Sequence, residues 1–307
     1  MHALRPRARR AGLLAPVALA GAAAALLVGW PTGPTPGGAA DRYRAGEPAT
    51  LRSSLPAAAA EAVRARGAAH ARALGIPVGA SFQEARVHDR FSGEALDEVV
   101  TTDARGRRLG IVQMDPAGRV AMAVRLGWQA PGGRRIDAAE ARLRAVGLAA
   151  ASGLDPSGTP TVSPAVDGGW RVAWGRAIDG VSALGDGAVV TLFGDGSFHA
   201  AARRERPLAE APPSVLASSA AEQIAGERLA DLLGPASGDA VITRARLAWV
   251  APNDTFDGAA PDAPDPVLRL AWVVEVRTVA ALAERLRALE LYLDAADGAL
   301  LGGDLLR

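Results

Sequence analysis

Two stretches near the end of this 307-residue chain decide its fold. They are Leu268-Arg-Leu-Ala-Trp-Val-Val-Glu-Val276 and Leu289-Glu-Leu-Tyr-Leu-Asp-Ala-Ala-Asp-Gly-Ala-Leu-Leu301. The first is a run of apolar, β-branched and aromatic residues, which is typical of a buried strand. The second alternates apolar and polar residues and then turns at Asp297-Gly298, a common two-residue hairpin signal. Together they predict antiparallel strands that pack on a hydrophobic core.

The composition is that of a globular protein and excludes several classes of site. Apolar residues make up 49%, charged residues 22%, and the net charge is +1, which gives no electrostatic reason to expect nucleic-acid binding. All 34 basic residues are Arg, so a P-loop lysine and a Schiff-base lysine are both excluded. The absence of Cys excludes a disulfide framework, a thiolate zinc site, a cysteine nucleophile and a lipid-anchoring cysteine.

The N-terminus has the pattern of an export segment. Four arginines lie between Arg5 and Arg10, and the 20 residues from Ala11 to Trp30 carry no charge. At 1.5 Å per residue this run is about 30 Å long, the thickness of one hydrocarbon core. We therefore expect residues 1–30 to form a signal-anchor whose membrane span runs from Leu13 to Trp30, with the N-terminus in the cytoplasm and the body outside.

A cleaved signal peptide ending at Ala20-Gly-Ala22 is the alternative. The apolar Leu26-Leu27-Val28 beyond that site favours the anchor, whereas the alanine richness favours cleavage and secretion. In both cases the body is extracytoplasmic, and residues 31–55, rich in Gly, Pro and Thr, are expected to form a flexible tether.

The body repeats one pattern three times, each time a helix, then strands, then a turn with Asp and Gly. The helices are predicted from Pro56 to Leu74, from the capping box Asp137-Ala-Ala-Glu140 to Ala151, and from the capping box Ser219-Ala-Ala-Glu222 to Gly234-Pro235. The main strands are predicted at residues 97–102, 109–114, 119–126, 170–176, 188–193, 197–202, 241–250 and 268–276. Residues 279–289 look helical and interrupt the pattern.

Each helix needs a sheet on which to bury its apolar side. We therefore predict an α+β fold of tandem units, each a helix packed on a small antiparallel sheet. The predicted units span residues 56–130, 135–207 and 212–307.

Two segments carry a family resemblance. The stretch from Ile178-Asp-Gly-Val-Ser-Ala-Leu-Gly185 to Phe193-Gly-Asp-Gly196 resembles the segment that precedes the PepSY module in thermolysin-like protease propeptides, with Ser182-Ala183 in place of Pro-Val. From Ser214 onward the chain looks like the PepSY module itself. The carrying motifs are the strand Leu247-Ala-Trp-Val250, the strand Leu270-Ala-Trp-Val-Val-Glu-Val276 and the turn Asp294-Ala-Ala-Asp-Gly298.

The resemblance implies three PepSY-like units, the first of them only by analogy, in a secreted or anchored protein. In the protease propeptides this module inhibits the enzyme that follows it and assists its folding. No protease domain follows here, which leaves a free-standing binding module.

Candidate catalytic and metal-binding residues form no recognisable site. His2, His70, His88 and His199 lack metal-site spacing. The acidic loop that starts at Asn253 and includes Asp257, Asp262 and Asp265 departs from the EF-hand pattern and is rich in proline, which indicates an exposed linker.

Side chains on the predicted strands have structural interpretations. Glu275 and Glu290 are expected to face solvent or to pair with Arg, and the pairs Trp170/Trp174 and Trp249/Trp272 are expected in the core, with an aromatic ligand platform as the alternative. We therefore predict no catalytic residue, no cofactor and no metal.

The leading hypothesis is a non-catalytic, membrane-tethered extracytoplasmic binding or regulatory protein, resembling a peptidase inhibitor, whose partner is an envelope protein or peptide. The second is an ectodomain that regulates a sensor kinase, as in the YycH/YycI group, which has the same layout. The third is a hydrolase with an unrecognised site. A kinase regulator would lose function if residues 11–30 were replaced by a cleavable signal, and a hydrolase would show turnover in a substrate screen.

The arginine flank and the uncharged run generate a prediction of topology. Alkaline phosphatase fused after Arg307 should be active in the envelope, because the body lies outside the membrane. A reporter that needs the cytoplasm should be inactive at the same position, and the opposite result would refute this orientation.

Overall fold

The computed structural model describes residues 52–88, 94–126, 134–154, 156–165, 168–253, 256, 267–278 and 288–306. The predicted span from Leu13 to Trp30, all but the last four residues of the tether and nearly all of the acidic loop lie outside these ranges. Within them, no helix is both long enough and apolar enough to cross a membrane.

Helices and strands follow one another in a regular order, one helix and then four strands, after a short first strand. The elements are β1 (Arg52–Ser53), α2 (Ala57–Ala73), β2 (Ser81–His88), β3 (Ala95–Thr102), β4 (Arg108–Met114), β5 (Val120–Arg125), α3 (Ala138–Ser152), β6 (Thr161–Pro164), β7 (Trp170–Ile178), β8 (Val181–Leu192), β9 (Phe198–Arg204), α4 (Ser218–Leu233), the 3₁₀ helix η1 (Gly234–Asp239), β10 (Ala240–Val250), β11 (Arg269–Thr278), β12 (Ala288–Asp294) and β13 (Leu300–Leu306).

The strands form one 13-stranded mixed sheet, so the prediction of tandem units with separate small sheets is wrong. The order is β1-β2-β3-β4-β5-β9-β8-β10-β11-β12-β13, with β6 and β7 paired beside β8. The reason for the error is that strands predicted to end separate sheets pair with each other. A strand with a free edge exposes N–H and C=O groups, and pairing satisfies them.

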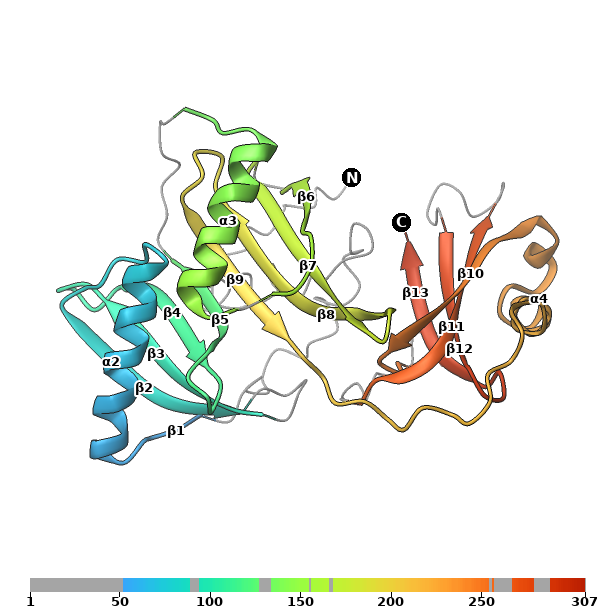
Figure 1. The fold of residues 1–307 in the computed structure, drawn as a ribbon, viewed down its shortest axis with the longest axis horizontal. Helices are drawn as coiled ribbons and strands as arrows, with labels where there is room; N and C mark the ends of the chain where they lie inside the picture. The colour runs from blue at the N-terminus through green and yellow to red at the C-terminus, as the bar shows by residue number, and fades with distance from the viewer. Residues whose placement is uncertain are drawn as a thin grey trace, which may run out of the picture.

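Two contacts make the sheet continuous. β5 pairs antiparallel with β9 at Met122↔Ala202, Ala123↔Ala201 and Val124↔Ala200. β8 pairs parallel with β10 at one position, Trp249↔Ala183. The second contact is narrow, and Figure 1 shows the strands β10 to β13 set apart from the rest of the sheet.

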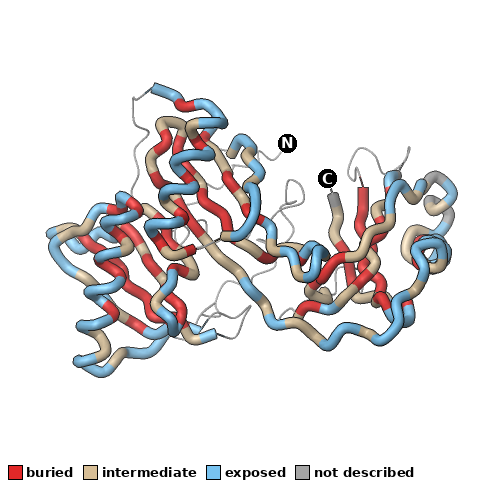
Figure 2. Tube along the Cα trace, viewed as in Figure 1, coloured by how far each residue is buried: buried red, intermediate tan, exposed pale blue. Residues whose placement is uncertain are grey.

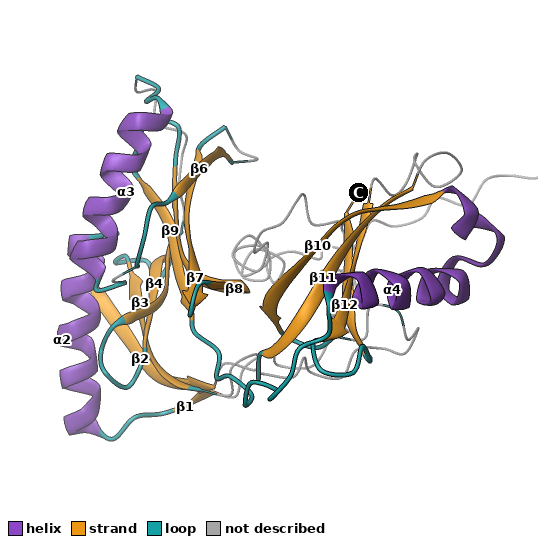
Figure 3. Cartoon of the chain, turned by 45° about the vertical axis from the view of Figure 1, so that its right-hand side comes forward, coloured by secondary structure: helices purple, strands orange, loops and turns teal. Residues whose placement is uncertain are grey.

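The helices cover the sheet from two sides. α2 and α3 lie on the same face of the N-terminal part, and α4 lies on the outer face of β10 to β13 (Figure 3). Buried residues concentrate along the strands, and the exposed residues of α2 and α3 lie on the side away from the sheet (Figure 2).

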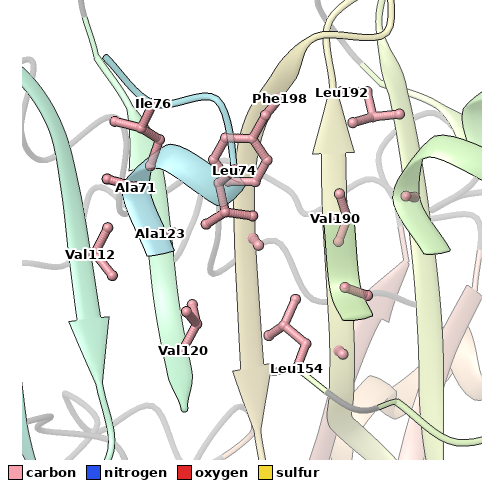
Figure 4. Packing of buried hydrophobic residues seen from close by; sticks show 14 of the residues in the cluster. Ala71, Leu74, Ile76, Val112, Val120, Ala123, Leu154, Val190, Leu192 and Phe198 are labelled. Atoms are coloured by element: carbon pink, nitrogen blue, oxygen red, sulfur yellow. The ribbon is translucent and has the colours of Figure 1, made fainter. Parts of the chain in front are cut away.

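The main core is built from small side chains. Ala141, Ala145 and Ala149 of α3 are at most 1% exposed and pack in one cluster with residues of β4, β5, β8 and β9. Figure 4 shows Leu74, at the end of α2, beside Phe198 of β9 within this cluster. Helices whose inward residues are alanines approach a sheet closely, so a core forms with few aromatic residues.

Gly67 is the closest point of this approach. A Cβ atom at Gly67 of α2 would overlap the side chain of Val99 on β3. The glycine that weakens the helix by its conformational freedom thus permits the packing of the helix on the sheet.

Of the two predicted capping boxes, one marks a helix start in the structure and the other does not. Asp137 caps α3, since its side chain accepts a hydrogen bond of 2.8 Å from the backbone N–H of Glu140. The capping box at Ser219 is wrong, because α4 begins at Ser218 after Ala217 and makes no side-chain cap.

The predicted tryptophan positions are confirmed. Trp174 is 3% exposed in the main core, and Trp170 packs beside it and donates from Nε1 to the carbonyl of Ile136 at 3.0 Å. Trp249 is 7% exposed, and Trp272 is partly buried and packs against the cluster under α4.

The C-terminal strands pair as the sequence indicates. β11 lies between β10 and β12, and the antiparallel hairpin β12–β13 is confirmed. Its turn is longer than two residues, because Gly298 donates to the carbonyl of Asp294 and Asp294 donates to the carbonyl of Ala299. A helix over residues 279–289 is wrong at its end, where β12 begins at Ala288, and the remainder lies outside the described residues.

A buried carboxylate lies where the N-terminal part of the sheet joins the C-terminal strands β10 to β13. Asp186 of β8 has a side chain that is 0% exposed. It accepts from Nη1 of Arg176 at 3.1 Å, and from Nε and the backbone N–H of Arg206 at 2.7 Å each. Arg206 lies in the segment that leaves β9 for the C-terminal part, so this cluster fixes that segment to β8.

We predict that Asp186→Ala lowers the free energy of unfolding by about 3–5 kcal/mol, because it leaves two partly buried guanidinium groups without their carboxylate. Urea unfolding followed by circular dichroism measures the change. The control is Glu210→Ala, at an exposed position of the segment after β9, which should cost less than about 0.5 kcal/mol. Equal losses in the two variants would show that Asp186 has no special role.

Candidate functional site

The histidines within the described ranges lie on three different elements, and two of them have structural partners. His70 of α2 lies 2.9 Å from the carbonyl of Gly118, so it connects the helix to the turn between β4 and β5. His199 stacks on Phe193 with ring centroids 4.4 Å apart. His88 is exposed at the end of β2. Among the described residues, no group of three or more potential ligands could hold a metal ion.

A charged row crosses the side of the C-terminal strands that faces away from α4. Leu289 and Leu291 of β12 pack under α4, so the alternate residues Glu290 and Tyr292 point to the other side. Glu290 is in register with Glu275 on β11 and with Asp304 on β13. Three carboxylates therefore lie side by side on neighbouring strands, an arrangement that repulsion disfavours unless cations or hydrogen bonds compensate.

Each carboxylate of the row has a partner. Glu290 accepts from Nη2 of Arg246 at 3.0 Å, and Glu275 lies 3.5 Å from Nε of Arg277. The hydroxyl of Tyr292 donates to Asp304 at 2.6 Å. The expected pairing of Glu275 and Glu290 with Arg is therefore confirmed, although Glu290 is buried rather than solvent-facing, with 4% exposure.

Glu290 is the least compensated member of the row. Its Oε2 atom is buried and has no hydrogen-bond partner within the described part of the chain. Burial raises the pKa of the Glu290 carboxyl, and the neighbouring Asp304 and Glu275 raise it further, against the attraction of Arg246. Burial, followed by the charge of Asp304, also raises the pKa of Tyr292 well above its ordinary value, so this phenol remains a hydrogen-bond donor.

In a second charged cluster, around Asp115, the pKa of the buried carboxyl is lowered rather than raised. Burial alone would raise the pKa of the Asp115 carboxyl, but hydrogen bonds from the backbone N–H of Arg119 and from the Arg203 and Arg119 side chains hold that pKa below its ordinary value. Arg203 of β9 contacts Asp115 at 2.6 Å with a side chain only 7% exposed. This ion pair stabilises the β5–β9 contact on the side of the sheet that bears the helices. The Asp115 carboxylate is occupied by its hydrogen bonds to Arg119 and Arg203.

The sheet edges form a different kind of candidate surface, one made of backbone groups. Within the described ranges, β13 ends the sheet at one side, β6 pairs only with β7, and β1 covers β2 only at Arg86 and Val87. An open strand edge exposes N–H and C=O groups that accept an additional strand.

Sequence reasoning missed Asp186, Arg246, Tyr292 and Asp304. The alternation from Leu289 to Asp294 does place Glu290 and Tyr292 on one face. Strand register alone could have placed Asp304 beside Glu290. Nothing local in the sequence marks Asp186, because both of its arginine partners come from other segments.

Comparison with known proteins finds similarity to solved structures but to no family model. No family model matches the chain, and no curated protein matches it. The solved structure of the Bacillus megaterium YpeB C-terminal domain superposes with a TM-score of 0.45 and 11% identity, over 82% of this chain and 98% of that one.

The raised pKa of Glu290 generates a prediction of pH dependence. A carboxyl whose pKa is higher in the folded state contributes most to stability below its unfolded pKa of about 4.3, and this contribution is lost as the pH rises through the folded pKa. Glu290→Gln should therefore be more stable than the wild type at pH 7, and this advantage should shrink as the pH falls towards 4.

Denaturant unfolding across this pH range measures the difference, and each pKa unit between the two states corresponds to about 1.4 kcal/mol. The exposed Glu210→Gln serves as the control and should differ from the wild type by less than about 0.5 kcal/mol throughout. A Glu290→Gln variant less stable than the wild type at pH 7 would mean that the ion pair with Arg246 outweighs the burial of the charge.

Proposed function

We propose that this chain is a non-catalytic, membrane-tethered extracytoplasmic protein that binds, and thereby regulates, another polypeptide of the cell envelope. The arginine-flanked uncharged segment from Ala11 to Trp30 supports the location. The PepSY-like motifs from Ser214 onward support the class of protein. Cleavage of the N-terminal segment would make it a secreted protein with the same binding role.

The observation that carries the proposal is the open edge of a large and well-supported sheet. Eight residues of β2 pair in continuous register with β3, from Ser81↔Thr102 to His88↔Ala95, while in the described part of the chain β1 covers only two positions on the other side. A fixed row of backbone donors and acceptors is complementary to any extended polypeptide and to few other molecules.

The buried carboxylates described above have structural partners. Asp186, Asp115 and Glu290 each pair with arginine side chains that come from other strands or from linking segments. The proposed binding function requires no chemistry from these groups.

The test is capture from native envelopes with the full-length protein, followed by analysis of the captured chain. The partner should be a polypeptide that is recovered intact after prolonged incubation. Its dissociation constant should change by less than about threefold between 0.1 and 0.5 M salt, because the net charge of +1 leaves little long-range attraction to screen.

Hydrolysis of a peptide, ester or phosphate substrate, abolished by a point mutation that leaves the protein folded, would overturn the proposal. Steep weakening by salt would show that charge rather than backbone pairing dominates the interaction.

A further inference from the structure

The described part of the sheet has several open edges, and they differ in how open they are. β13 ends the sheet at one side, β6 is outermost beside β7, and β2 is open where the two-residue β1 does not pair with it. β10 meets β8 only at Trp249, but its register with β11 shifts between Ile242 and Arg244, so a bulge interrupts that edge. Natural sheets commonly block an outer strand with a proline, a bulge, a short length or a covering loop, because an open edge promotes association with other chains. An edge that lacks all of these features is a candidate for a functional contact.

The edge of β13 is already occupied by the chain itself. The backbone N–H of Asn253 donates to the carbonyl of Leu301 at 2.8 Å. The side-chain oxygen of Asn253 accepts from the N–H of Gly303 at 3.0 Å. A Cβ atom at Gly302 would overlap Asn253, so the segment after β10 lies directly against this strand.

β6 is a poor template for another strand. It has four residues, Thr161 to Pro164, and follows Pro160. Pro164 has no N–H to donate, and proline at a strand end is a common device against strand pairing.

β2 lacks these blocks between Ser81 and Ala85. Its register with β3 is continuous from Ser81↔Thr102 to His88↔Ala95, so no bulge bends it away. This stretch contains no proline, and Ser81 and Gln83 are exposed. Among the described residues, β1 pairs with β2 only at Arg86 and Val87, beyond this stretch.

The stretch from Ser81 to Ala85 is also supported by α2 and the main core on the helix-bearing side of the sheet. Val99 of β3 contacts α2 at Gly67, and Glu84 is in register with Val99, so Glu84 points towards the helix, where Arg64 binds it. On the same side Phe82 packs against the main core. Because the strand is already fixed in its extended form, an incoming segment loses only its own conformational freedom on binding.

We propose that the outer edge of β2, from Ser81 to Ala85, binds an extended segment of the partner polypeptide as an additional strand, an assignment that rests on the proposed polypeptide-binding function. The bound segment continues the sheet beside β2, in line with β1. Backbone hydrogen bonds supply its affinity.

The side chains along this edge indicate which segments fit. One side offers the exposed and uncharged Ser81 and Gln83, with the buried Ala85 beyond them. The other side offers the apolar ring of Phe82 and the Glu84 carboxylate, which Arg64 already neutralises. Uncharged segments rich in β-branched residues therefore fit this edge best, because they favour the extended form and meet no unpaired charge.

The experiment uses linear peptides of about ten residues, the upper range of natural strand lengths. Peptides are selected from a display library by binding to the full-length protein and are then synthesised. In hydrogen exchange, a selected peptide should protect backbone amides of residues 81–85 more than those of β6 or β13.

Alternate N-methylation of the peptide tests the binding mode. Methylating every second backbone nitrogen should weaken binding by about tenfold or more in one of the two alternate sets, because several backbone hydrogen bonds are lost together. Methylating the other set should change the affinity by less than about threefold, since those groups point away from β2.

The absence of native cysteine allows a matched blocking test. Gln83→Cys and Thr161→Cys, both at exposed strand positions, are each labelled with a bulky maleimide. The label at position 83 should reduce peptide affinity about tenfold, and the label at position 161 should have less than about a twofold effect. Unchanged thermal melting of both labelled proteins confirms that they are folded.

The outcomes separate the two proposals. Peptides that bind but protect another strand, or that tolerate the label at position 83, overturn the assignment to β2 and leave polypeptide binding intact. A β2 edge occupied by a second copy of this chain, detected as a dimer that the same label dissociates, also overturns it. Failure to select any peptide overturns the proposed function, and the assignment with it.

Discussion

The fold depends on one buried carboxylate, that of Asp186. A charge with no exposure is tolerated only if it is paired and hydrogen-bonded. Asp186 meets this condition through Arg176 on β7 and Arg206 on the segment after β9. The next residue, Gly187, has φ +126°, and a Cβ atom there would overlap the carbonyl of Trp174. The strand therefore bends at the point where its carboxylate is fixed.

The consequence is that β8 serves both parts of the sheet. Its later residues pair with β9, whereas Ala183 pairs with Trp249 of β10. Arg206 donates from Nη2 to the carbonyl of Leu184 at 2.7 Å, and Pro207 next to it accepts from the N–H of Leu268 at 2.8 Å. The carboxylate, the bend and the link to β11 thus lie at one place, where Ala183, Trp249 and Leu268 also form a small hydrophobic cluster.

Small side chains and arginine–carboxylate ion pairs both stabilise this sheet. Alanines bring α2 and α3 close to the strands, and arginines bind the carboxylates that are buried between strands, as Arg203 does with Asp115. The planar guanidinium group suits such pairs because it presents several donors at once. Because the strands join into one sheet, edges inside it are paired. The strand edges that could bind a partner are therefore the outer ones. Of these, β13 is closed by Asn253, whereas β2 presents backbone groups on a rigid support.

The sequence by itself determined the local features of this protein. Apolar, β-branched runs such as Leu270 to Val276 were correctly predicted as strands, and Asp137 was correctly predicted as a helix cap, because these features depend on neighbours within a few residues. The core positions of Trp170 and Trp174 followed from alternation along one strand. Only the tertiary structure decided that β5 pairs with β9 and β8 with β10. These pairings join residues that lie 80 apart in sequence, as Met122 and Ala202 do, or 66 apart, as Ala183 and Trp249 do, and such distant partners leave no local trace. The partners of Asp186, the burial of Glu290 and the open edge of β2 could not be predicted for the same reason, because each depends on how strands from distant segments pair in the folded protein.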